Sequence, residues 1–63
     1  MNRVKELREK KRIKQVEFAN KLGITNDYLS KIELGKQTPG FKLAAKIANE
    51  FGTSIDSLNF FNE

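Results

Sequence analysis

Apolar residues recur every three to four positions along the 63-residue chain, the spacing that gathers side chains on one face of an α-helix. No stretch alternates apolar and polar residues for long enough to predict a β-strand. Together with its glycines and capping residues, the pattern predicts five helices separated by short turns. We therefore expect a single all-α domain over residues 1–63, folded as a compact five-helix unit.

The first two helices are expected in residues 2–11 and 15–22. Asn2 is a suitable N-cap for the first helix, because its side-chain oxygen can accept a bond from a free backbone N–H. Gly23 is suited to end the second helix, because glycine readily takes the positive φ that follows many helices. The residues expected on the buried faces of these helices are Val4, Leu7, Phe18, Ala19 and Leu22.

The remaining elements are a third helix capped by Thr25, a fourth in residues 41–51 and a short fifth capped by Ser54. Residues 35–40 are rich in turn-forming residues and predict a loop, and Gly52 should end the fourth helix. The side chains expected in the core from this half of the chain are Ile24, Leu29, Ile32, Phe41, Ala44, Ile47, Ala48, Phe51, Ile55 and Leu58.

The positive charge of the chain is concentrated near its start. Twelve Lys and Arg residues exceed eight Asp and Glu residues, which gives a net charge of +4 and a pI of about 9.6. Residues 1–14 contain seven basic and two acidic side chains, a balance of +5, whereas residues 15–63 contain five and six, a balance of −1. This excess is either a solvated helix face or an electrostatic footprint for a polyanion, for which nucleic acid is the first candidate.

The residue types that are absent argue against an enzyme. The sequence has no Cys and no His, which removes disulfides, thiolate metal ligands and the commonest general base. It has no Gly-rich phosphate loop or metal-spaced cluster, so we expect no cofactor and no small-molecule ligand. No apolar run approaches the roughly 20 residues that cross a membrane, and the charged start lacks the apolar stretch of a signal peptide. These features predict a cytoplasmic protein without a membrane partner.

Residues 15–34, QVEFANKLGITNDYLSKIEL, have the pattern of two helices that cross at about 90–120° through a short turn. Small Ala19 allows a close helix approach, Gly23 lies at the turn and Ile24 lies beneath it. A generic pair of packed helices is the alternative. Against it, seven constrained positions fall in the register that a helix-turn-helix requires: Phe18, Ala19, Leu22, Gly23, Ile24, Leu29 and Ile32.

Over about residues 4–58 the chain resembles the lambda-repressor-like, or Xre/Cro-type, helix-turn-helix DNA-binding domains. The resemblance rests on LREKKR-x-x-Q, EFANKLGIT, YLSKIELGK, the following Pro39, KIANEFG and SIDSL. It implies a five-helix lambda-repressor-like domain whose third helix enters the major groove as the recognition helix, while the second crosses the DNA backbone. It also implies a salt bridge between Arg8 and Glu33, which would join the first and third helices.

The resemblance also implies which residues meet DNA. Gln15 matches a phosphate-contacting position at the start of the second helix, and Gly35 and Lys36 match a phosphate-contacting loop. The helical spacing independently predicts that a polar face lies opposite Leu29 and Ile32 on the third helix. The expected DNA-binding residues are Lys14, Gln15, Thr25, Asn26, Asp27, Tyr28, Ser30, Lys31 and Lys36.

The residue types on the third helix suit base edges, although each has a simpler interpretation. Asn26 can bond adenine, Lys31 can reach guanine, and Asp27 can accept from cytosine N4. The carboxylate of Asp27 is also favourable in the first turn of any helix, where it meets the positive end of the helix dipole. The ring of Tyr28 can pack on the first helix with its hydroxyl in water.

Three positions depart from the family pattern. Arg12 stands where the family has Gly with positive φ, which costs roughly 1–2 kcal/mol if that geometry is kept. Lys14 stands where Ser or Thr caps the second helix, and losing this cap costs about 1 kcal/mol. Leu34 replaces a polar residue beside the phosphate-contacting loop. It either packs at the helix end or contacts a thymine methyl group.

Phe60 and Phe61 follow the last predicted helix. Adjacent side chains cannot both point to one face of a helix, so one ring is expected to complete the core and the other to be exposed. We assign both residues to a homodimer interface. The alternative is that both rings fold onto the core of their own domain.

The sequence therefore predicts a DNA-binding transcriptional regulator, a repressor that binds a palindromic operator in double-stranded DNA as a homodimer and is associated with the nucleoid. Phage, mobile-element and restriction–modification control are all compatible with it. The alternative is an antitoxin-type module of the same fold, whose main partner is another protein.

Overall fold

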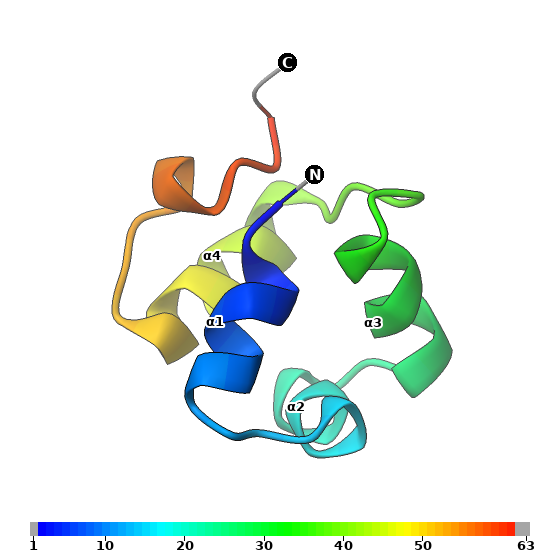
Figure 1. Ribbon diagram of the computed structural model, residues 1–63. Helices are drawn as coiled ribbons and strands as arrows, with labels where there is room; N and C mark the ends of the chain where they lie inside the picture. The colour runs from blue at the N-terminus through cyan, green and yellow to red at the C-terminus, as the bar shows by residue number, and fades with distance from the viewer. Residues whose placement is uncertain (1, 62–63) are drawn as a thin grey trace.

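The structure, a computed structural model that describes residues 2–61, consists of four α-helices and a short 3-10 helix (Figure 1). The elements are α1 (Val4–Lys10), α2 (Gln15–Leu22), α3 (Asn26–Glu33), α4 (Phe41–Phe51) and η1 (Asp56–Leu58). No strand occurs in this part of the chain, which confirms the all-α prediction. The prediction of five helices holds only in part, because η1 is a single 3-10 turn between the left-handed residues Gly52 and Asn59.

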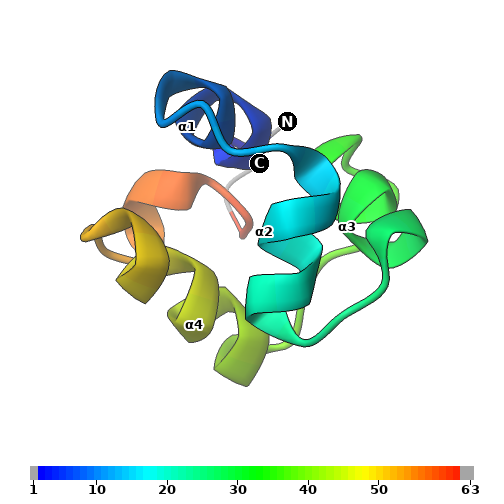
Figure 2. The same cartoon turned by 90° about the horizontal axis from the view of Figure 1, so that it is seen from below.

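The helices surround one core. α2 packs against both α3 and α4, and η1 lies between α1 and α4 (Figure 2). Arg3, just before α1, donates its backbone N–H to Leu58 O at 3.0 Å and its Nη1 to Ser57 O at 3.4 Å. These bonds hold the start of the chain against η1.

The core consists of ten buried apolar side chains that come from every helix, and Pro39 in the loop before α4 is buried as well. The ring of Phe18 also stacks on the half-buried ring of Phe51, with centroids 5.0 Å apart. All but one of the side chains expected in the core are buried or pack against it. The ten are Val4, Phe18, Ala19, Leu22, Leu29, Ile32, Ala44, Ile47, Ala48 and Leu58.

The exception is Phe41, whose predicted burial is wrong. Its side chain is 74% exposed. Phe41 has the helical register of the buried residues Ala44 and Ala48, but the first turn of α4 lies at the edge of the molecule (Figure 2). Register therefore gave the correct face of the helix, while no neighbouring helix extends far enough to cover its first turn.

Side chains and glycines set the helix boundaries much as predicted. Thr25 caps α3, since its Oγ1 accepts from Tyr28 N at 3.1 Å, and Gly23 ends α2 with a φ of 74°. Asn2, which was expected to be the N-cap of α1, lies one position before the observed N-cap residue, Arg3, but its Oδ1 still accepts from Val4 N at 3.1 Å.

Two of the three residues that depart from the family pattern, Arg12 and Lys14, lie in the turn between α1 and α2. Arg12 has a φ of 58°, in the left-handed region that disfavours a side chain. Lys14 takes the N-cap position of α2, and a lysine offers no acceptor for the free N–H groups of the first turn. Glu17 compensates in part, because its Oε1 accepts from Lys14 N at 3.0 Å.

Arg12→Gly is expected to be more stable than Arg12→Ala by about 1 kcal/mol, because both variants remove the charge and only glycine relieves the left-handed strain. Urea unfolding followed by circular dichroism measures this difference. Equal stabilities would mean that the turn does not hold residue 12 at positive φ in solution.

Candidate nucleic-acid interface

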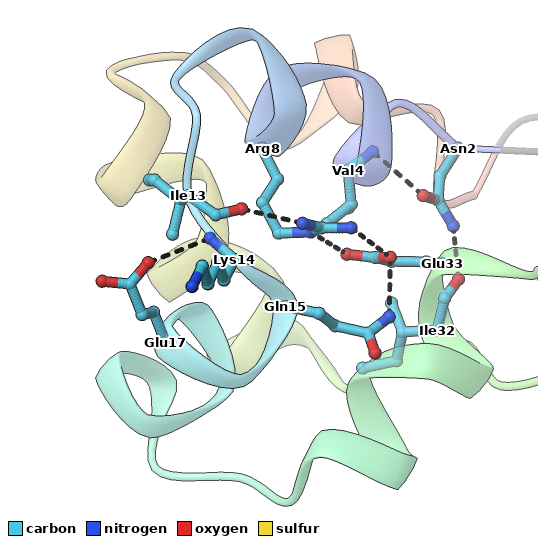
Figure 3. Close-up of polar contacts among 9 residues, drawn as sticks. All are labelled: Asn2, Val4, Arg8, Ile13, Lys14, Gln15, Glu17, Ile32 and Glu33. Carbon is cyan, nitrogen blue, oxygen red and sulfur yellow. Dashed lines mark hydrogen bonds and ion pairs between the residues drawn. The ribbon is translucent and has the colours of Figure 1, made fainter.

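A buried ion pair joins α1 to α3 (Figure 3). Arg8 Nε donates to Glu33 Oε2 at 2.7 Å, and Arg8 Nη2 donates to Glu33 Oε1 at 3.2 Å. Arg8 is 7% exposed and Glu33 is 4% exposed. This is the pair that the family resemblance implied, and its two parallel bonds fix the direction of both side chains.

Two further bonds connect this pair to the turn before α2 and to its first residue. Arg8 Nη1 donates to Ile13 O at 2.8 Å, and Gln15 Nε2 donates to Glu33 Oε1 at 3.0 Å (Figure 3). The end of α3 is therefore held against the beginning of α2. Gln15, expected on sequence grounds to bind phosphate, also has this internal role, which the sequence did not indicate.

One face of α3 remains open. Asn26, Asp27 and Lys31 are exposed, and Tyr28 and Ser30 are half-buried. Leu29 and Ile32 are buried on the opposite side, as the helical spacing predicted, and Glu33 is buried at the end of the helix. Thr25 is also exposed, with its hydroxyl oriented by the cap bond. The residues expected to read bases therefore share one solvent-facing surface.

Two of these residues contact each other. Lys31 Nζ lies 3.4 Å from Asp27 Oδ2, one helical turn away. The pair is open to solvent, with side chains 50% and 82% exposed respectively, so it adds little to folding stability. It does make the middle of the open face nearly neutral.

Exposed cations lie in the segments before α2 and after α3. Lys36 follows α3, where its backbone N–H donates to Lys31 O at 2.9 Å, and Lys14 precedes α2. Lys10, at the end of α1, and Lys11 and Arg12, in the turn that follows, are exposed, and none of them forms an ion pair within residues 2–61. These three residues are not among the DNA-binding residues predicted from the sequence, although the charge excess of residues 1–14 pointed to them.

Leu34 caps α3 and is 52% exposed. Its side chain helps to line an open crevice of about 240 Å³ at the junction of the three N-terminal helices. The Arg8–Glu33 pair also lines this crevice, together with Gln15 and Ser30. Leu34 is therefore available for a contact outside the fold.

The two terminal phenylalanines differ in burial. Phe60 is half-buried and packs against the core, while Phe61 is 55% exposed. Their rings meet edge to face, with centroids 6.1 Å apart. The two residues lie beyond η1, outside the helix-turn-helix.

The described residues offer little for other kinds of site. No group of three or more His, Cys, Asp or Glu residues among them is arranged to hold a metal ion. None of the helices in residues 2–61 has the length and apolar character needed to cross a membrane.

Comparisons with known proteins agree with this geometry. The Helix-turn-helix family matches residues 4–58. Over 97% of its length, the chain is 38% identical to an uncharacterized HTH-type transcriptional regulator of Archaeoglobus fulgidus. The match covers 86% of that protein. Over 98% of its length, it is 36% identical to a similarly named protein of Methanocaldococcus jannaschii. The match covers 94% of that protein. Over 71% of its length, it is 42% identical to the ImmF control region 10 kDa protein of Bacillus phage phi105. The match covers half of that protein. No solved structure matches.

Glu33→Ala is expected to destabilise the fold by about 3–5 kcal/mol, because it leaves the Arg8 guanidinium buried without its partner. A loss of this size is a large part of the free energy of unfolding of a small domain, so most of the molecules would be unfolded. Urea unfolding measures it, with the exposed acid Glu9→Ala as control. A loss below about 1 kcal/mol would mean that the pair is solvated in solution.

Proposed function

Because the chain belongs to the lambda-repressor-like helix-turn-helix family, we propose that it regulates transcription by binding a specific sequence of double-stranded DNA. Its two archaeal relatives are named HTH-type transcriptional regulators, and neither name indicates an enzyme. The observation that carries the proposal is the open polar face of α3. The buried Arg8–Glu33 pair holds the end of this helix against the start of α2.

In this proposal α3 lies in the major groove, which is about 12 Å wide and accepts one α-helix. Asn26 bonds an adenine through N6 and N7, and Lys31 donates to a guanine. Ser30 and Tyr28 contribute hydrogen bonds at the edge of the same face. Thr25 positions the first turn of α3, with its methyl group close to the DNA.

Phosphate contacts come from Gln15 and from cations outside α3, and not from α3 itself. Gln15 bonds one phosphate through the amide hydrogen that Glu33 does not use, and Lys14 and Lys36 lie on either side. The exposed cations of residues 10–12 extend this attraction along the DNA backbone. Attraction to phosphate supplies sequence-independent affinity, so the binding should weaken strongly as the salt concentration rises.

We further propose that the protein acts as a repressor and binds as a homodimer to a palindromic operator. A two-fold dimer uses the same apolar patch of both subunits, so the exposed ring of Phe61 is covered in each of them. Two copies of α3 would then meet half-sites about one helical turn apart, roughly 34–36 Å. The likeness to a phage control-region protein supports a phage or mobile-element circuit, and such a regulator would associate with the nucleoid.

The second candidate is an antitoxin-type module whose main partner is a protein. The exposed apolar side chains of Phe41 and Phe61 favour it, because such side chains suit a protein surface. Tight one-to-one association with the product of a neighbouring gene, without selective DNA binding, would identify this function.

Asn26→Ala and Lys31→Ala should each weaken binding to a duplex selected from a random pool by about 1–3 kcal/mol, and binding to unrelated duplex far less. The reason is that base contacts exist only on the selected sequence. Fluorescence anisotropy with both duplexes measures the two losses. Equal losses on both would make these residues phosphate contacts and contradict the base-reading role.

Phe61→Ser should weaken self-association and cooperative operator binding while the monomer stays helical, because the exposed ring adds little to the core of its own domain. Analytical ultracentrifugation and circular dichroism on the same sample separate the two effects. Phe60→Ser is the matched comparison and should reduce helicity, since this ring packs against the core. An unchanged dimer constant for Phe61→Ser would remove this residue from the interface.

A further inference from the structure

The acidic residue Asp27 lies on the surface that the proposed function directs at DNA. Its side chain is 82% exposed, and the only ion pair that it makes within residues 2–61 is with Lys31. A carboxylate on this face is repelled by phosphates, so it lowers the affinity for DNA in general. It can favour a complex only where a base offers a hydrogen-bond donor.

The chemistry of the carboxylate limits which bases can meet it. An ionised Asp accepts hydrogen bonds and donates none. In the major groove the donors are the N4 amino group of cytosine and the N6 amino group of adenine. Asp27 can therefore face only one of these two groups.

Lys31 distinguishes between them. Its Nζ lies 3.4 Å from Asp27 Oδ2, so the pair presents an acceptor beside a group of donors. A C·G pair presents the complementary row, with cytosine N4 as donor at one side and guanine O6 and N7 as acceptors beside it. The ammonium can then bridge both guanine acceptors while the carboxylate takes the cytosine amino group.

An A·T pair fits less well. Its single amino group lies between two acceptors, adenine N7 and thymine O4, so the carboxylate would be placed between two repelling atoms. The ammonium could reach only one of these acceptors. An A·T pair thus offers fewer bonds and more repulsion than a C·G pair.

We propose that Asp27 and Lys31 read one C·G base pair together in each half-site of the operator. This inference rests on the proposed function, since it requires α3 to lie in the major groove. It assigns a base preference to a residue that would otherwise only oppose binding. It also makes the exposed ion pair part of the recognition surface and not a stabilising device for the helix.

The test measures affinities for a duplex selected by the wild-type chain and for its variants with each base pair at each half-site position. At one position the wild type should prefer C·G to A·T by about 5- to 150-fold. Asp27→Asn should shift that preference towards A·T, because an amide pairs with adenine N6 and N7. Asp27→Ala and Lys31→Ala should both act at this position, and their effects should not add, since both residues read the same pair.

Glu9→Ala is the matched control, because it removes one exposed negative charge outside α3 and should raise affinity equally on all duplexes. Circular dichroism checks that each variant is folded. If Asp27→Ala also raises affinity equally on all duplexes, or if the two residues act at different positions, the shared reading is overturned while the proposed function stands. A wild-type chain that selects no sequence would overturn both.

Discussion

The bidentate bond between Arg8 and Glu33 is the interaction on which the rest of the structure depends. Removing two charges from water costs several kcal/mol for each ion, so such a pair is tolerated only when its polar atoms are satisfied. Here Gln15 supplies the third bond to the carboxylate, and Ile13 O accepts from the guanidinium. No buried side-chain N or O atom in the described part of the chain lacks a partner. The ends of α1 and α3 and the start of α2 therefore meet in one fully bonded cluster.

This cluster determines which side of α3 is available. The apolar residues Leu29 and Ile32 hold the helix against the core, and Glu33 holds its last turn against α2. The opposite side is left in solvent with almost no net charge, because Asp27 and Lys31 neutralise each other. Cations that form no ion pair within residues 2–61 lie in the turn before α2. In the proposed function, affinity for the DNA backbone and recognition of bases therefore come from different segments of a very small domain.

The sequence predicted most of the fold because its signals are local. Thr25 and Gly23 set helix ends through bonds and dihedral angles of their own segments. It was wrong about Phe41, because helical register identifies a face but not where the neighbouring helix stops. The predicted fifth helix is a single 3-10 turn, because the left-handed residues Gly52 and Asn59 leave too few residues between them for a longer helix.

The candidate site was less predictable from the sequence. Spacing alone identified the polar face of α3, while the Arg8–Glu33 pair came from the family resemblance. The bond from Gln15 to Glu33 joins residues 18 positions apart, and no local pattern indicates it. The contact of Asp27 with Lys31 follows a common helical spacing, but its use depends on the surface being open.

The central claim is that the open face of α3 is the surface that meets DNA. Nuclear magnetic resonance tests it most directly, by following every backbone amide while the chain is titrated with a duplex that it selects from a random pool. The account predicts that the largest shift changes fall on α3, the first turn of α2 and residues 35–36. Changes confined to α4 and the segment after η1, with α3 unperturbed, would contradict it.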